Sequence, residues 1–273
     1  MPKVEWNKET WDGSYNWEHK GDEWSQGWGG PSMQWHGTIL PRVHQYLPTG
    51  TILEIAPGYG RWTQFLKDKC HTLVGIDLSQ ACIDACRRRF AGLTHLTFDV
   101  NDGRSLDMVR DNSIDFAFSF DSLVHADDDV IEAYVAQLSR KLTKDGVAFL
   151  HHSNFGEYPY LDRIDRMPEK PRRMLAKLKV IEPVLHFRSP TMTATKLEGF
   201  ARQSDMQCIA QELVPWGGRT AFSDCLSTIV KRSSSRVREN RLFRNPHFMK
   251  EAQYLSRLSH LYGPASDTVM SHT

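Results

Sequence analysis

The chain of 273 residues lacks any apolar run approaching the ~18 residues that a membrane-spanning helix needs. Its first residues are rich in tryptophan and charge and do not resemble a secretion signal, so we expect a cytoplasmic protein with no membrane partner. An excess of charge is also lacking, because 34 Lys and Arg residues stand against 33 Asp and Glu residues. Without a net positive field, nucleic acid is disfavoured as a partner.

Cysteine is scarce, with five residues scattered along the chain. Cys82 and Cys86 are one helical turn apart, but no histidine or second cysteine pair is placed to complete a metal site with them. We therefore interpret both as small core residues and predict no metal centre.

A third glycine is missing from the most informative stretch of the chain. Thr51–Ala56 has the pattern of a buried strand, and Gly58 and Gly60 follow it before an amphipathic helix that begins at Trp62. Such a turn lets a ligand approach the backbone and the N–H groups at the start of the helix. The dinucleotide fingerprint has one more glycine, but Thr63 stands in its place, which favours a nucleoside over a pyrophosphate ligand.

A second apolar run, 71–77, ends in Asp77, about 20 positions after the glycines. A carboxylate at this spacing meets the hydroxyls of a ribose. The two runs together predict a nucleoside site at the ends of two neighbouring strands.

Strands and helices alternate through most of the chain, which predicts an α/β, Rossmann-like, doubly wound and mostly parallel sheet with helices on both faces. Asp145-Gly146 is expected to end the helix before the fifth strand. We predict strands at 51–56, 71–77, 94–98, 114–120, 146–152, 208–213 and 225–230, and helices at 32–47, 62–69, 79–90, 129–142, 193–204 and 246–261.

Four motifs occur in order between residues 45 and 155. They are Glu54-Ile55-Ala56-Pro57-Gly58-Tyr59-Gly60, Val74-Gly75-Ile76-Asp77-Leu78-Ser79, Asn101-Asp102-Gly103 and the segment 115–125 that ends in Phe120-Asp121-Ser122-Leu123-Val124-His125. In this order and spacing they resemble the class I S-adenosylmethionine-dependent methyltransferases, and within them the O-methyltransferases of sugars and other small molecules. Pro57 is a departure, because many members have a small residue there.

The resemblance implies S-adenosyl-L-methionine as cofactor and a seven-stranded sheet with an antiparallel last strand. Asp77 would accept hydrogen bonds from both ribose hydroxyls, and Asp102 from the adenine amine, with Asp99 as its rival. The cofactor-binding residues that the resemblance implies are Glu54, Ala56, Gly58, Gly60, Asp77, Leu78, Asp102, Gly103 and Phe120.

Histidines near the ends of the fourth and fifth strands are the candidate bases. His125 follows the fourth strand, where the resemblance places the methyl group, and an imidazole suits proton abstraction near neutral pH. A structural or merely pocket-lining histidine is the alternative. His152 is the second catalytic candidate, and His151, Asn154 and Asp121 are candidates for binding the acceptor. Because side chains alternate along a strand, only one of His151 and His152 can face the site.

A metal-dependent variant is a further alternative, since Asp121 and the cluster Asp127-Asp128-Asp129 could hold Mg²⁺ against a diol. Consecutive aspartates more often cap a helix, and here they precede one. We therefore predict no metal ligand among them.

Residues 1–48 form a tryptophan-rich arm that contains six of the eight tryptophans. So many aromatic side chains predict a segment that folds onto the domain, either as a packing arm or as a lid over the cofactor and acceptor. Trp24 and Trp28 are the candidates for stacking on an acceptor.

The cofactor-binding domain is expected over residues 49–232, followed by a helical tail over 233–273. An insertion at 154–192, rich in proline and basic residues, is expected to cap the acceptor; a solvated charged helix at 172–179 is the alternative. The helix of the tail should pack back on the domain or on a second subunit, so a homodimer is possible.

The sequence therefore predicts a methyltransferase that acts on a small-molecule hydroxyl, with a sugar, a glycan or a glycosylated natural product as the expected acceptor. An amine or carboxylate acceptor is the alternative within the same class, since the tryptophans could then form a box for a cation. A binding protein that holds the cofactor without catalysis is the alternative from another class.

Overall fold

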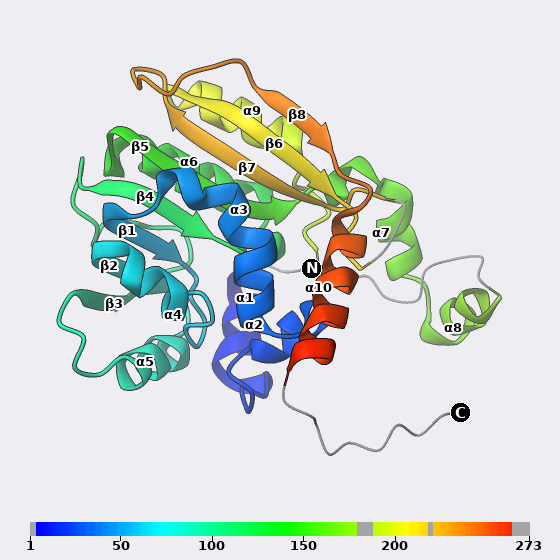
Figure 1. The fold of residues 1–273 in the computed structure, drawn as a ribbon. Helices are drawn as coiled ribbons and strands as arrows, with labels where there is room; N and C mark the ends of the chain where they lie inside the picture. Colours follow the sequence, from blue (N-terminus) through cyan, green and yellow to red (C-terminus); the bar gives the residue numbers. More distant parts are fainter. Residues whose placement is uncertain (1–3, 179–187, 218–220, 264–273) are drawn as a thin grey trace.

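The computed structural model describes residues 4–178, 188–217 and 221–263, which form one sheet with helices on both faces (Figure 1). The order of the strands is β3-β2-β1-β4-β5-β7-β6-β8, and every pair is parallel except those that β7 makes with β5 and β6. This confirms the predicted Rossmann-like, mostly parallel sheet, but the sheet has eight strands rather than seven. The strands are β1 (Thr49–Ile55), β2 (Cys70–Asp77), β3 (Leu96–Val100), β4 (Ile114–Ser119), β5 (Leu142–Ser153), β6 (Met206–Val214), β7 (Asp224–Lys231) and β8 (Arg241–Arg244).

The additional strand, β8, lies in the segment that was expected to be a helical tail. It runs parallel to β6, with Arg241 opposite Ala210 and Arg244 opposite Leu213. All four of its side chains are exposed, so the strand has no buried face and no alternation of polar and apolar residues. Only its backbone pairing makes it a strand, and a pattern of side chains could not predict it.

The strands are buried on both sides because helices cover both faces of the sheet. Leu53 packs in a core cluster with residues of α6 (Asp128–Lys141) and α9 (Ala194–Gln203). Its neighbour Ile52 packs on the opposite face, with residues of α4 (Thr63–Leu66), α5 (Gln80–Arg89) and α10 (Phe248–Tyr262). Burial on both faces explains why the strands read as continuous apolar runs.

The helix before the fifth strand ends earlier than expected. α6 ends at Lys141 and β5 begins directly at Leu142, so Asp145-Gly146 lies inside the strand. The pairing of β4 with β5 shifts between Ile114 and Phe116, and this irregularity accommodates the extra residues.

The N-terminal arm, residues 4–48, contains α1 (Val4–Glu9), α2 (Pro31–Gln34) and α3 (Leu40–Val43). The predicted helix at 32–47 is therefore interrupted, with a wide helical turn between α2 and α3. Pro41 contributes to the interruption because it has no N–H to donate to the preceding turn.

The C-terminal helix α10 packs against this arm rather than extending away from the domain (Figure 1). The Trp28 and Phe248 rings meet edge to face at 6.0 Å, and the Ser259 hydroxyl donates to the Gly29 carbonyl at 3.0 Å. The two ends of the chain thus hold each other against one face of the sheet.

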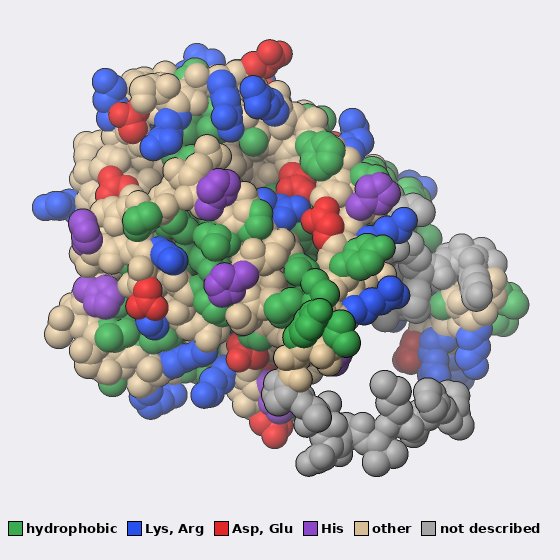
Figure 2. Space-filling view, in the orientation of Figure 1, with side chains coloured by type: hydrophobic (Ala, Val, Ile, Leu, Met, Phe, Trp, Pro, Cys, Tyr) green, Lys and Arg blue, Asp and Glu red, His purple; other side chains and the backbone are tan. Residues whose placement is uncertain are grey.

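The exposed side of α10 carries large apolar side chains among polar and charged ones (Figure 2). Its exposed large side chains are Tyr254, Leu258, Leu261 and Tyr262. The homodimer suggested by the sequence stays a prediction.

The insertion between β5 and α9 contains α7 (Pro159–Asp165) and α8 (Glu169–Lys177). α8 has no buried residue, as expected for a solvated charged helix. Lys179, and the part of the predicted cap up to residue 187, lie outside the described residues. Among the helices that the structure describes, none is both long and apolar enough to cross a bilayer.

The contact between the arm and α10 gives a stability prediction at Gly29. This residue has a positive φ of 83°, and a Cβ built on it would lie 2.4 Å from the Ser259 Cβ and 3.2 Å from the Ser256 Cα. Gly29→Ala should lower the free energy of unfolding by about 1–3 kcal/mol, because backbone strain and a steric clash act together. Urea denaturation measures the change.

Gly27→Ala is the matched control, because a Cβ there meets no atom within 4 Å. It should change the free energy of unfolding by less than about 1 kcal/mol. Equal losses in the two variants would contradict the packing of α10 on the arm.

Candidate functional site

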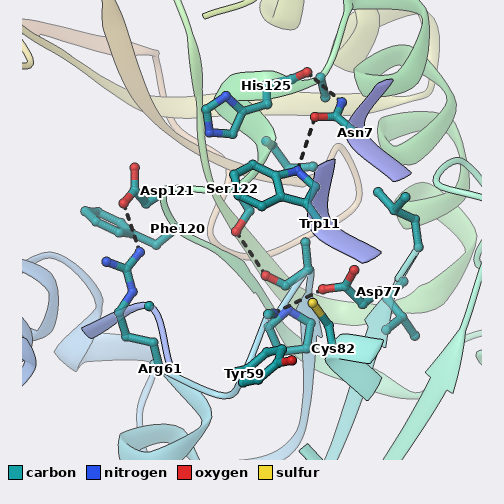
Figure 3. A pocket seen from close by; sticks show the side chains of 18 of the residues that line it. Asn7, Trp11, Tyr59, Arg61, Asp77, Cys82, Phe120, Asp121, Ser122 and His125 are labelled. Carbon is teal, nitrogen blue, oxygen red and sulfur yellow. Dashed lines mark hydrogen bonds and ion pairs between the residues drawn. The ribbon is translucent and has the colours of Figure 1, made fainter. Parts of the chain in front are cut away.

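A cavity lies beyond the carboxyl ends of β1, β2 and β4, and the N-terminal arm covers it (Figure 3). The cavity and the solvent-open space at its mouth together contain about 890 Å³. Its walls come from the turn after β1, the end of β2, the segment after β4 and the first part of the arm.

The turn after β1 has the left-handed backbone that its glycines allow. Ala56 and Gly58 have φ of 57° and Gly60 has φ of 81°. A Cβ on Gly60 would lie 2.5 Å from the Phe90 ring, so glycine is also required by the space available. All three residues were predicted to bind the cofactor; Ala56 and Gly58 line the cavity, while Gly60 supports the turn from behind.

Asp77, at the end of β2, lines the cavity and is fixed by backbone groups. One carboxylate oxygen accepts from the Gly58 N–H at 3.1 Å, and the other accepts from the Ser79 N–H at 2.9 Å. Burial raises the pKa of this carboxyl to about 6. The carboxylate therefore has a fixed direction and remains ionised near neutral pH.

Glu54, also predicted to bind the cofactor, lies behind the turn and is not among the residues that line the cavity. It is fully buried, and its Oε2 accepts from the Thr63 hydroxyl at 2.5 Å while its Oε1 has no partner. Burial raises the pKa of this carboxyl to about 7. Thr63, which stands where a third glycine would fall, is thus the hydrogen-bond donor to Glu54.

The side of the cavity near β3 is lined by Leu78 and Gly103, which the sequence suggested as cofactor-binding residues, and also by Tyr134. The Asp102 carboxylate instead accepts from the backbone N–H groups of Arg104 and Ser105, at 2.8 and 2.6 Å, and does not line the cavity. Its rival Asp99 is half exposed, 3.9 Å from Arg87, and does not line the cavity either.

Aromatic side chains of the arm form the roof of the cavity. Trp11, Trp17 and Trp24 line it, and the Trp17 ring stacks on the Tyr59 ring with centroids 4.4 Å apart and planes 5° from parallel. Trp28 lies instead in the core, where its indole N–H donates to the Thr38 hydroxyl at 2.9 Å. The arm therefore packs on the domain and covers the cavity, and the two roles that the sequence left open belong to different tryptophans.

The segment after β4 brings Phe120, Asp121 and His125 to the cavity. The Asn7 side chain ties this segment to the arm, because it donates to the His125 carbonyl at 3.0 Å and accepts from the Trp11 indole at 3.3 Å (Figure 3). The Trp11 and His125 rings lie 5.5 Å apart.

Asp121 and Arg61 present a buried ion pair to the cavity. The Arg61 Nη2 lies 2.8 Å from the Asp121 Oδ2, and both residues line the cavity. The guanidinium also faces the rings of Trp24 and Trp62, 5.2 and 4.5 Å from their centroids. The sequence did not identify Arg61, Tyr59, Trp11 or Trp17 as residues of the site. The position of Arg61 directly after the glycine turn was a signal that could have indicated it.

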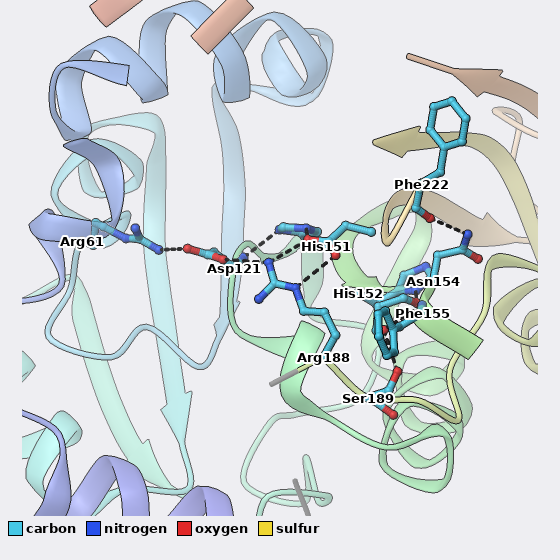
Figure 4. Close-up of polar contacts among 11 residues, drawn as sticks. Arg61, Asp121, His151, His152, Asn154, Phe155, Arg188, Ser189 and Phe222 are labelled. Carbon is cyan, nitrogen blue, oxygen red and sulfur yellow. Dashed lines mark hydrogen bonds and ion pairs between the residues drawn. The ribbon is translucent and has the colours of Figure 1, made fainter. Parts of the chain in front are cut away.

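His151, His152 and Asn154 lie behind the cavity wall, fully or almost fully buried (Figure 4). The His151 Nδ1 accepts from the Asp121 N–H at 3.0 Å, and its Nε2 donates to Asp224 at 3.0 Å. The His152 Nδ1 donates to the Ser153 carbonyl at 2.8 Å, and burial lowers the pKa of this imidazole to about 4. None of the three lines the cavity, so their predicted roles in catalysis and acceptor binding remain predictions without a direct contact.

The three aspartates at the start of α6 have partners in the protein. Asp127 accepts from the Ser189 hydroxyl, Asp128 pairs with Lys196 and Asp129 pairs with Arg104. Within the part of the chain that the structure describes, no group of three or more His, Cys, Asp or Glu side chains could hold a metal ion.

Comparison with known proteins finds a matching family model for part of the chain and a shared fold. Residues 52–146, from β1 into β5, match the family model described as "Methyltransferase domain". Among solved structures, the chain is similar to the PH0226 protein from Pyrococcus horikoshii, with 19% identity, a TM-score of 0.53, and coverage of 82% of this chain and 95% of that one. It is also similar to an S-adenosylmethionine-dependent methyltransferase from Clostridium acetobutylicum, with 13% identity, a TM-score of 0.54, and coverage of 72% and 91%. At these identities the structures show a shared fold. No curated protein matches the sequence.

The buried carboxyl of Glu54 gives a pH-dependence prediction. The pKa of its folded form is about 7 against an ordinary value of 4.5, so the folded state binds this proton more tightly than the unfolded state. The stability that the proton contributes is complete below about pH 4.5 and is lost as the pH rises through 7, a loss on the order of 3 kcal/mol. Glu54→Gln should therefore be more stable than the wild type at about pH 8 and similar to it at about pH 5.

Unfolding free energies measured across this pH range test the prediction, with Glu18→Gln at an exposed position as the control. A wild type and a Glu54→Gln variant that lose stability in parallel would contradict it.

Proposed function

We propose that this protein is a methyltransferase with S-adenosylmethionine as its cofactor and that its acceptor is a hydroxyl group of a small molecule. Residues 52–146, which match a methyltransferase domain, support the activity. A sugar, or a natural product that carries one, is the favoured acceptor class. The observation that carries the proposal is a covered cavity in which aromatic rings and one histidine lie together beyond the glycine turn.

The residues at the strand ends fit the cofactor. The Asp77 carboxylate has the position and charge to accept from two ribose hydroxyls, and the turn at Gly58 leaves room for a ligand against the backbone. Leu78 and Gly103 supply an apolar wall for a base. When bound, the cofactor supplies an electrophilic methyl group on a sulfonium.

The arm favours a small acceptor. Val4, Asn7 and the roof tryptophans close the cavity above the sheet, so a macromolecule would reach it only after the arm moved. The exposed apolar faces of tryptophan rings suit the faces of sugar rings. A mixed distribution of 34 basic and 33 acidic residues gives no field that would attract nucleic acid.

A hydroxyl acceptor must lose a proton as it gains the methyl group, and His125 is the proposed base. Its half-buried ring lines the cavity on the side of the Trp11 ring, and the Asn7 bridge holds its backbone. Near neutral pH an imidazole is available in its neutral form and can accept a proton.

An amine acceptor is the second candidate, supported by two aromatic rings that line the cavity. The Trp24 and Trp62 rings already face the Arg61 guanidinium, so this part of the cavity accommodates a cation. An amine that reaches the site deprotonated would need no strong base. The dependence of the rate on His125 therefore separates the two acceptor types.

Cofactor binding is tested on Asp77. S-adenosylhomocysteine at ~100 times its dissociation constant should stabilise the wild type by about 2.7 kcal/mol. Asp77→Ala should lose most of this stabilisation, because the carboxylate that accepts from the ribose is removed. Thermal unfolding with and without the ligand measures both. An unchanged ligand effect in Asp77→Ala would remove Asp77 from the cofactor site.

Catalysis is tested on His125. With an acceptor found by screening sugars, phenols and amines, His125→Ala should lower kcat by about 10²–10⁴-fold and leave the affinity for S-adenosylhomocysteine unchanged. His260→Ala, on the exposed side of α10, is the control. A wild-type rate in His125→Ala with a hydroxyl acceptor would refute the proposed base, and turnover of amines alone would replace the hydroxyl proposal.

A further inference from the structure

A continuous chain of buried polar side chains runs behind the cavity wall and ends at Asp121 (Figure 4). Arg188 donates to Asp224 through Nε at 3.0 Å and through Nη2 at 2.8 Å. The Asp224 carboxylate accepts from the His151 Nε2 at 3.0 Å, and the His151 Nδ1 accepts from the Asp121 backbone N–H at 3.0 Å. We refer to Arg188, Asp224 and His151 as the relay.

The hydrogen bonds of the relay determine the tautomer of His151. A backbone N–H can only donate, so the Nδ1 that accepts from it carries no proton. The Nε2 must then carry the proton, and it donates to Asp224. Arg188 balances the charge of Asp224 and orients it with a two-pronged contact, which a planar guanidinium makes well.

The far end of the relay holds a residue in an uncommon conformation. Asp121 has a positive φ of 63°, a region that residues other than glycine rarely occupy. In this conformation its carboxylate points to Arg61, with Arg188 on its other side at 3.9 Å. Because the peptide N–H of Asp121 is fixed by His151, the direction of its side chain depends on residues that do not touch the cavity.

The Arg61–Asp121 pair matches one part of the cofactor in charge. The amino-acid end of S-adenosylmethionine carries an ammonium and a carboxylate, which need an anionic and a cationic partner. Both residues of the pair are buried, both line the cavity, and Arg61 directly follows the glycine turn that the cofactor would lie against. Asp121 was expected to bind the acceptor, but its pairing with Arg61 fits the cofactor better.

We propose that Arg188, Asp224 and His151 are positioning residues, which hold Asp121 so that the Arg61–Asp121 pair receives the amino-acid end of the cofactor. Arg188 belongs to the insertion between β5 and α9, and Asp224 begins β7. Elements outside the family match at 52–146 therefore set the affinity of the cofactor site. The inference rests on the cofactor and does not depend on the identity of the acceptor.

The test compares two ligands that share adenosine. S-adenosylhomocysteine has the amino-acid end, and 5′-methylthioadenosine lacks it. In Asp224→Asn the side chain can no longer accept from both Arg188 and His151, and the amide favours the other histidine tautomer, which cannot accept from the Asp121 N–H. Calorimetry should show about a tenfold weaker affinity for S-adenosylhomocysteine and an affinity for 5′-methylthioadenosine within about twofold of the wild type.

Two further variants make the result specific. Asp121→Asn should weaken the same ligand selectively, and the double variant with Asp224→Asn should lose no more than Asp121→Asn alone, since the relay acts through Asp121. Ser227→Ala, also on β7, removes the hydroxyl that donates to His152 and leaves the relay intact, so it should keep the wild-type ratio of affinities.

Arg188→Lys is the milder variant should Asp224→Asn fail to fold, because it keeps the charge and loses the two-pronged contact. It should also lower the ratio of affinities selectively. The nitrogen resonances of His151 supply an independent readout: a protonated Nε2 and a bare Nδ1 in the wild type, reversed in Asp224→Asn. Equal losses for both ligands, additive losses in the double variant, or an unchanged tautomer would overturn the proposal.

Discussion

The hydrogen bond from the Gly58 N–H to the Asp77 carboxylate, 3.1 Å long, joins the ends of two parallel strands where both residues line the cavity. It exists because β1 and β2 are in a register that sets Ile55, the last residue of β1, beside Ile76, the residue before the end of β2. The left-handed turn at Gly58 then directs its N–H toward the carboxylate. Trp17 stacks on Tyr59 in the same turn, so the roof of the cavity is built on this contact as well.

The cavity is closed by the two ends of the chain acting together. The arm brings aromatic rings over the strand ends, and α10 packs against the back of the arm. This enclosure has a chemical consequence, because a covered, mostly aromatic site excludes water from a reactive methyl donor. It also explains why six of the eight tryptophans lie in the first 37 residues. Some of them form the roof, and others, such as Trp28 and Trp35, are buried in the core and anchor the roof there.

Charged groups behind the cavity are costly to bury and gain little net stability from pairing. Arg188 and Asp224 form an ion pair in which both side chains are fully or almost fully buried. The role of this pair is therefore to orient His151 rather than to raise the stability of the fold. It ends at Asp121, whose left-handed backbone is unusual for a residue other than glycine. Two segments distant in sequence thus meet at one wall of the site.

Local sequence patterns predicted much of the fold of this protein. Continuous apolar runs predicted the parallel strands, the glycines predicted the turn, and the spacing of Asp77 predicted its place beside that turn. These features are encoded by neighbouring residues, so the sequence by itself determined the sheet and the glycine turn with Asp77 beside it. The strand β8 depends on backbone pairing, which its side-chain pattern does not reveal. The helix predicted at 32–47 is interrupted by a wide turn near Pro41, which the helical spacing of its apolar residues does not reveal. Tertiary structure alone decided which tryptophans form the roof and which side chains face the cavity. It also decided that Arg188, Asp224 and His151 are linked to Asp121. These contacts join residues far apart in the chain, and they form only when whole helices and strands pack together.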